Sequence, residues 1–203
     1  GATPEAAATY VRRLQERLQA EPGVAMTSVT TTPPLGDLRV MAALELNGRP
    51  LDVHIHQVDA QYLRAMSIPL LRGRQLTPAD TRGVIVSDRL ARLRWPGGDA
   101  LGQIFSIGDD PLEVIGVTAD ARAVAPGDAS AVDVYRLASL ADFPFISLIV
   151  RTTGPADAHL PAIAAAAAGI DPAIRPRVSW LKERHQVQTA DLRRSALAMS
   201  VLG

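Results

Sequence analysis

Two histidines, His54 and His56, stand two positions apart in a stretch with the alternating pattern of a β-strand. Side chains two apart on a strand point to the same face of a sheet, so both imidazoles could reach one metal ion. A zinc site needs at least one further ligand, and Asp52 lies on the same face. Polar residues two apart are also typical of an edge strand whose polar face is exposed to solvent. We favour this interpretation of the two histidines. Asp52, His54 and His56 are therefore candidate ligands, but we expect no tight zinc site.

Other residues with catalytic potential stand in positions that favour a structural role. Asp109-Asp110 could be a pair of carboxylates for acid–base chemistry, but it lies in a predicted hairpin turn, where Asp is common for its turn geometry. The sequence contains no Gly-x-Ser-x-Gly elbow, no Gly-x-Gly-x-x-Gly loop and no Walker loop. We predict no catalytic residue and no cofactor, and we expect the chain not to be an enzyme.

Charge and hydropathy exclude several further classes of protein. Lys plus Arg and Asp plus Glu both number 21, and this neutral balance argues against a nucleic-acid partner. The chain has no cysteine, which excludes disulfides and thiolate metal sites. It also has no run of about 18 apolar residues that could span a bilayer. We expect the 203 residues to be a soluble segment of a longer protein.

The elements that must position these residues are short and alternate between strand and helix. Asn47-Gly48 predicts a hairpin turn between two of the strands. Asp59, Thr77 and Ser87 are predicted N-caps of helical segments. Strands are predicted over 24–32, 40–46, 51–58, 84–86, 103–107, 112–118, 145–151 and 177–180, and longer helices follow Thr3 and cover 89–94, 156–169 and 181–202.

The order of the turn and cap signals carries a resemblance to a known family. The runs Ser67–Asp80, Val86–Gly102 and Val114–Asp120 resemble three consecutive motifs of the MacB-like extracytoplasmic (periplasmic) core domain of ABC transporter permeases, of the FtsX/MacB type. Ser67 stands where the family motif has Gly, and Ser87-Asp88 where it has Asn-Glu. We interpret the matching positions as structural: Pro69, Gly73, Arg74, Asp80, Pro96, Gly97, Leu101, Gly102, Gly116 and Asp120. Arg74 is expected to pair with Asp80.

The resemblance and the split pattern of elements together imply an α+β fold with two lobes. We expect residues 1–58 and 121–203 to form a discontinuous, split ferredoxin-like (porter-like) α/β lobe and 59–120 an inserted, smaller α/β lobe. The core of the inserted lobe is predicted to contain Tyr62, Leu63, Leu70, Val84, Ile85, Leu90 and Val114.

The function that the resemblance implies is mechanical. A cell-membrane permease would carry this domain on its extracytoplasmic side and couple cytoplasmic ATP hydrolysis to the movement or handling of a substrate or partner protein. The implied partners are a second permease copy, a cytoplasmic ATPase subunit or domain, and a periplasmic or extracellular protein. The alternative is an extracytoplasmic ligand-binding or sensor module. An exposed apolar patch would favour protein handling, and a deep pocket with convergent polar groups would favour the ligand-binding module.

Overall fold

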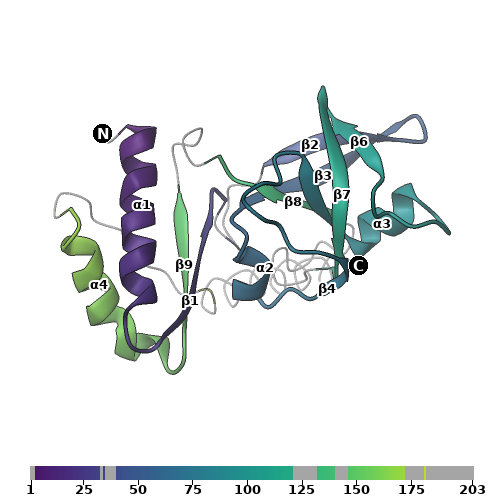
Figure 1. Ribbon diagram of the computed structural model, residues 1–203. Coiled ribbons are helices and arrows are strands. Elements are labelled where there is room, and N and C mark those ends of the chain that lie inside the picture. Colours follow the sequence, from purple (N-terminus) through teal and green to yellow (C-terminus); the bar gives the residue numbers. More distant parts are fainter. Residues whose placement is uncertain are drawn as a thin grey trace, which may run out of the picture.

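The strands of the described residues join into one mixed β-sheet flanked by helices (Figure 1). The structure is a computed structural model and describes residues 3–32, 34, 40–120, 132–139, 146–171 and 181. The helices are α1 (Pro4–Gln19), α2 (Tyr62–Ala65), α3 (Asp88–Arg94) and α4 (Leu160–Ala168), with the 3-10 helix η2 (Ala156–His159). The strands are β1 (Val24–Thr30), β2 (Met41–Leu46), β3 (Arg49–Val58), β4 (Leu70–Gly73), β5 (Gly83–Ser87), β6 (Ile104–Ile107), β7 (Asp110–Thr118), β8 (Asp133–Leu137) and β9 (Ser147–Thr152).

The sheet has the strand order β4-β7-β5-β8-β3-β1-β9, with β2 added to β3 and β6 added to β7. The pairs β3–β8 and β5–β7 are parallel, and the other pairs are antiparallel. β3 is an interior strand. One of its edges pairs with β8, and the other pairs first with β2 and then, at Val58, with β1.

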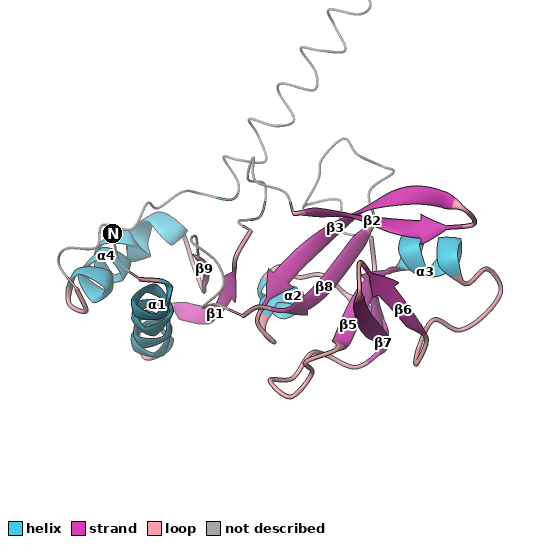
Figure 2. Cartoon of the chain, turned by 90° about the horizontal axis from the view of Figure 1, so that it is seen from above, coloured by secondary structure: helices cyan, strands magenta, loops and turns pink. Residues whose placement is uncertain are grey.

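At one end the sheet curls, so that β2 and β6 approach each other over a hydrophobic core (Figure 2). Strands β2, β3, β5, β6, β7 and β8 all contribute side chains to this core, and α3 covers it with Leu90 and Ala91. The guanidinium of Arg94, the last residue of α3, donates to the backbone carbonyl of Glu45 in β2 at 2.8 Å. This hydrogen bond links α3 to the free edge of β2.

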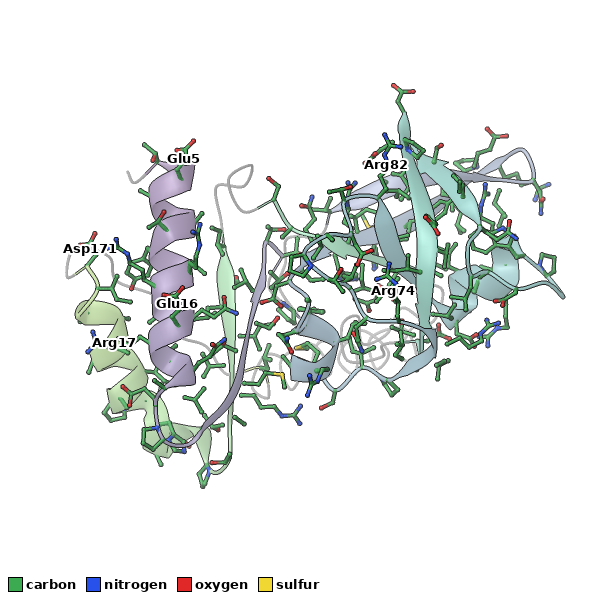
Figure 3. The ribbon with its side chains drawn as sticks, viewed as in Figure 1. Glu5, Glu16, Arg17, Arg74, Arg82 and Asp171 are labelled. Atoms are coloured by element: carbon green, nitrogen blue, oxygen red, sulfur yellow. The ribbon has the colours of Figure 1, made fainter. Side chains whose placement is uncertain are left out.

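At the other end, α1 and α4 pack on β1 and β9. Tyr10, Leu14 and Leu18 on one stripe of α1 are buried against Val29 of β1 and side chains of β9. The hydroxyl of Tyr10 donates to the carbonyl of Ala167 in α4 at 3.2 Å. Figure 3 shows the side chain of Arg17 directed from α1 toward α4. The amphipathic pattern of α1 therefore places this helix between the sheet and α4.

Several local predictions are confirmed. The β2–β3 hairpin turns at Asn47 and Gly48, which have φ angles of 52° and 76°. Thr3 caps α1 by accepting a hydrogen bond from the backbone of Ala6, and Ser87 caps α3 by accepting one from Leu90. The mixed α/β fold class is confirmed as well. The lobe boundaries at 58/59 and 120/121 stay a prediction.

Other local predictions are wrong, each for a physical reason. Asp59 does not cap α2, whose N-cap is Gln61, because the Asp59 carboxylate also bonds to β1. Thr77 begins only a turn, since its amide and hydroxyl both donate to Asp80. The predicted helix 156–169 is divided into η2 and α4, with Pro161 in the first turn of α4.

The predicted core is confirmed except at one position. Tyr62, Leu63, Val84, Ile85, Leu90 and Val114 are buried. Leu70 is only half-buried, because it begins β4, an edge strand that pairs with β7 alone. The predicted strand 177–180 and helix 181–202 lie outside the described residues, apart from Leu181. No helix in the described ranges has the length and hydropathy to cross a membrane.

Replacing Leu90 with Ala should destabilise the chain by roughly 2–5 kcal/mol, because Leu90 is fully buried in the core beneath α3 and the truncation leaves a cavity. Leu93 on the same helix is 39% exposed, so Leu93→Ala is a matched control that should change stability by less than about 0.5 kcal/mol. Urea unfolding of both variants measures the difference. Equal losses would mean that the buried face of α3 is assigned wrongly.

Candidate functional site

His54 and His56 lie in the interior of the molecule, which corrects the interpretation of an exposed edge strand. β3 has neighbours on both edges, and both imidazole side chains are less than 10% exposed. The strand alternates so that Val53 and Ile55 face the core under α3, while the two histidines face the opposite side of the sheet. A polar strand face is thus buried, and it needs polar partners.

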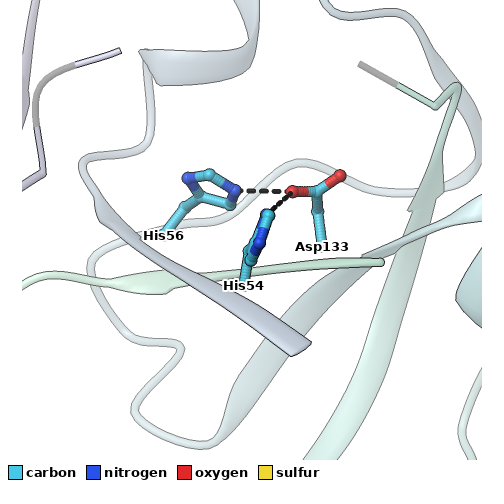
Figure 4. Close-up of side chains that lie close together, drawn as sticks. All are labelled: His54, His56 and Asp133. Carbon is cyan, nitrogen blue, oxygen red and sulfur yellow. Dashed lines mark hydrogen bonds and ion pairs between the residues drawn. The ribbon is translucent and has the colours of Figure 1, made fainter. Parts of the chain in front are cut away.

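The partner of both histidines is Asp133, at the start of β8 (Figure 4). The parallel register places His54 beside Asp133 and His56 beside Tyr135. Asp133 Oδ1 lies 2.7 Å from His56 Nε2 and 3.7 Å from His54 Nδ1. A nitrogen–oxygen separation of 2.7 Å is a strong, charge-assisted hydrogen bond. Asp133 therefore holds both imidazoles on one face of two adjacent strands.

Asp52, the third ligand proposed from the sequence, is exposed and is not in this cluster. Sequence analysis missed Asp133, because no strand was predicted around it. The only signal for it was its position immediately before the apolar pair Val134-Tyr135. Its proximity to β3 depends on a parallel pairing between strands far apart in the sequence, and local patterns do not specify that pairing.

Two tyrosines complete the surroundings of the cluster. The ring of Tyr135 stacks on His56 with a centroid distance of 4.7 Å and an interplanar angle of 18°, and Tyr62 lies beside Tyr135. Both hydroxyls are buried without a hydrogen-bond partner in the described part of the chain. Burial raises the pKa of Tyr62 and of Tyr135, and the negative charge of Asp133 raises both further. Both phenols are neutral donors at physiological pH.

A second polar centre lies at the junction between β1 and β3. These strands share one register pair, Thr30 with Val58, against six between β1 and β9. Asp59 reinforces this short pairing, because its carboxylate accepts hydrogen bonds from the Ser28 hydroxyl at 2.6 Å and the Val29 amide at 2.9 Å. It also accepts bonds from the side chain of Gln15 and the amide of Gln61. We call this junction the Asp59 joint.

Arg151 of β9 makes a second connection across the same region. Its guanidinium donates to the carbonyls of Arg64 and Ala65 at the end of α2 and to the hydroxyl of Ser67. Ser67 has a φ angle of 55°, and the Ile68 amide donates back to Leu63 as in a Schellman helix end. Serine thus occupies a left-handed position that favours glycine, and its hydroxyl contacts Arg151.

The first family-like motif forms a polar turn at the edge of the sheet. Arg74 makes two hydrogen bonds to Asp80, at 2.7 and 2.6 Å, which confirms the expected pairing. Arg74 holds the pKa of Asp80 well below its usual range, and the Thr77 bonds lower it further. Beside this pair, a Cβ on Gly73 would lie 2.3 Å from the Ile115 carbonyl, so the close approach of β4 to β7 requires glycine there.

Comparison with known proteins identifies the family. The model of the MacB-like periplasmic core domain matches residues 3–169.

The chain belongs to the MacB-like periplasmic core domain family.

Similar curated proteins carry the same family name. A probable export ATP-binding/permease protein MacB of Pseudomonas entomophila is 40% identical over 74 residues, which is 34% of this chain and 11% of that protein. The macrolide export ATP-binding/permease protein MacB 1/2 of Paracoccus denitrificans is 31% identical over 122 residues, 58% of this chain and 17% of that protein. The chain therefore spans less than a fifth of either relative.

Solved structures share the fold of this MacB-like domain at low sequence identity. The periplasmic region of MacB from Actinobacillus actinomycetemcomitans has a TM-score of 0.56 at 13% identity and covers 77% of this chain and 72% of that one. The extracellular domain of the ABC-type transporter YknZ from Gram-positive bacteria also has a TM-score of 0.56, at 17% identity. The match covers 77% of this chain and 79% of that one. These likenesses support the mixed α/β fold.

Within this MacB-like domain, the remaining motif positions lie in turns and contacts around α3 and β7. Asp120 accepts a hydrogen bond from the Arg89 amide at 2.8 Å and pairs with Arg92. Gly97 and Gly102 have positive φ angles, Leu101 packs against the core, and Pro96 follows the end of α3. Pro69 and Gly116 flank the pairing of β4 with β7. Asp110, once considered for acid–base chemistry, forms an ion pair with Arg136.

Replacing Asp80 with Asn should destabilise the chain at neutral pH by about 1–3 kcal/mol, because Arg74 and Thr77 lose a buried charged acceptor. The native pKa of Asp80 is depressed, so its contribution is present above the unfolded value of about 3.9 and is lost as pH falls below it. Urea unfolding should show a difference in the free energy of unfolding between the unmodified chain and Asp80→Asn at neutral pH. This difference should become smaller below about pH 4.

Asp99 is the matched control, since it pairs with Arg72 but its side chain is 62% exposed. Asp99→Asn should have a small effect at every pH. A stability gap for Asp80→Asn that stays constant through the acid range would contradict the assigned shift.

Proposed function

We propose that this chain is the extracytoplasmic domain of an ABC transporter permease. In this proposal, ATP hydrolysis in a cytoplasmic subunit or domain moves the domain through the membrane part of the permease. The domain then moves or handles a substrate or a partner protein outside the membrane. It works beside a second permease copy and is not catalytic itself. Membership in the MacB-like family and the ATP-binding/permease names of the curated relatives support the proposal.

The observation that supports transmission of movement through the domain is the Asp59 joint. α1, α4, β1 and β9 form one group of elements, and the curled strands with α3 form another (Figure 1). In the sheet, β1 and β3 share one register pair, and the junction is bridged by Asp59, by Arg151 and by the hydrophobic cluster around α2 that includes Val58 and Ile149. A displacement of one group passes to the other through this narrow connection, because packed groups of elements move as rigid bodies.

One groove on the described surface bears on the choice between protein handling and small-molecule binding. An open groove runs between the edges of β2 and β6, lined in part by Leu44, Glu45, Arg94 and Phe105. Ile104 on its rim is 70% exposed. The groove is open rather than deep, and the Arg94 guanidinium is bonded to the backbone of Glu45. An open groove with one exposed apolar side chain can contact a protein surface but does not enclose a small ligand.

Asp59→Ala in the full-length permease should reduce transport about fivefold or more, while basal ATP hydrolysis persists, since the connection between the two groups loses its central acceptor. Transport and ATPase rates measured on the same reconstituted protein separate the two effects. Asp52→Ala is the matched control, because Asp52 lies on the same strand and is exposed. Transport that is unaffected by Asp59→Ala, or an equal loss of ATPase activity, would contradict coupling through the joint.

A further inference from the structure

We propose that His54, His56 and Asp133 form a binding site for a divalent transition-metal ion of the zinc class. The three residues are the one group in the described residues whose potential ligand atoms gather closely, all within 4.8 Å of one another. This inference is independent of the proposed transport function. It also reverses the expectation of no tight zinc site, which rested on an exposed edge strand.

The backbone positions the three donors before any side chain adjusts. His54 and His56 share a face because they are two residues apart on β3, and Asp133 is the register partner of His54 on β8. Both strands are interior in the sheet, so their separation is fixed by hydrogen bonds on both sides. Ligands on rigid strands hold their geometry better than ligands on loops.

The two distances from Asp133 to the imidazoles lie on either side of the separation expected between the ligand atoms of a tetrahedral ion. Zinc binds histidine nitrogen at about 2.0–2.1 Å and carboxylate oxygen at about 2.0–2.2 Å, so tetrahedral ligand atoms lie about 3.3 Å apart. Asp133 Oδ1 lies 3.7 Å from His54 Nδ1 and 2.7 Å from His56 Nε2. The shorter contact is a hydrogen bond that needs a proton on His56 Nε2. A metal ion bound at Nε2 takes the place of that proton, and the ring binds the ion as the neutral tautomer that carries its single proton on Nδ1.

The ligand types select the class of ion. Two imidazoles and one carboxylate suit zinc, cobalt or nickel, whereas calcium and magnesium prefer oxygen ligands throughout. Three protein ligands leave a fourth position on a tetrahedral ion for water. The buried hydroxyls of Tyr62 and Tyr135, which have no partner in the described ranges, are polar groups near Asp133 to which such a water could bond.

Neighbouring contacts orient the ligands. The ring of Tyr135 stacks on His56, and the amide of Asp133 donates to Ser87 Oγ at 3.1 Å. Such surrounding contacts fix ligand orientation in protein metal sites. All three ligand side chains are less than 10% exposed, which shields the ion from solvent.

The test is a titration of the tag-free 203-residue chain, after treatment with a chelator, with Co²⁺ and then Zn²⁺. The expected result is one ion per chain, with the visible absorption of tetrahedral Co²⁺ and its displacement by zinc. His56→Ala and Asp133→Asn should each weaken zinc binding by about tenfold or more, as measured by calorimetry. Asp52→Asn, on the same strand but outside the cluster, should bind like the unmodified chain.

X-ray absorption at the zinc edge provides a measurement that does not depend on how the variants fold. It should report a shell of nitrogen and oxygen ligands that includes two histidines. Absence of one-to-one binding by the unmodified chain at micromolar zinc would overturn the proposal. Zinc binding that is retained in a folded His56→Ala variant, but lost in Asp52→Asn or His159→Ala, would also overturn the proposal. That result would place the ion outside the cluster of His54, His56 and Asp133.

Discussion

The carboxylate of Asp59 accepts four hydrogen bonds at the narrowest point of the sheet, from α1, β1 and the residues before α2. Besides Asp59, the β1–β9 part of the sheet is joined to the curled part by one register pair, by the hydrogen bond from the Thr31 amide to the Gln57 carbonyl, and by the hydrophobic cluster around α2. A short strand pairing is a weak connection, and a half-buried charged acceptor with several donors strengthens it in one defined geometry. The relative placement of the two hydrophobic cores at either end therefore depends on this residue together with the hydrophobic cluster around α2.

β3 is long enough to pair with three neighbouring strands, and it connects both parts of the sheet with the buried histidines. Its first residues pair with β2, its last with β1, and its other edge with β8. One face of the strand supplies Val53 and Ile55 to a hydrophobic core. The other face supplies His54 and His56 to a buried polar cluster. A buried polar face needs polar partners, and Asp133 forms a hydrogen bond with His56 at 2.7 Å and lies 3.7 Å from His54.

Local chemistry made the hairpin at Asn47-Gly48, the Ser87 cap and the Arg74–Asp80 pair predictable, since each depends on residues close in sequence. The candidate site was only half predictable. The two histidines were found from their spacing, but Asp133 was missed and Asp52 chosen because the parallel pairing of β3 with β8 joins distant segments. Asp59 was misassigned as a helix cap for the same reason, since its bonds to Ser28 and Val29 reach a strand far earlier in the chain.

The contact of Arg94 with the Glu45 carbonyl has a consequence for how copies of this chain meet. β2 presents a free edge to the groove, and an unpaired edge strand can accept a strand from another molecule. The guanidinium occupies one of the acceptors along that edge, and its charge lies 5.7 Å from the ring of Trp95 and 5.8 Å from that of Phe105. A bulky cation held over the edge by two aromatic rings disfavours sheet extension from one copy to the next, so the same residue that anchors α3 protects the domain against aggregation.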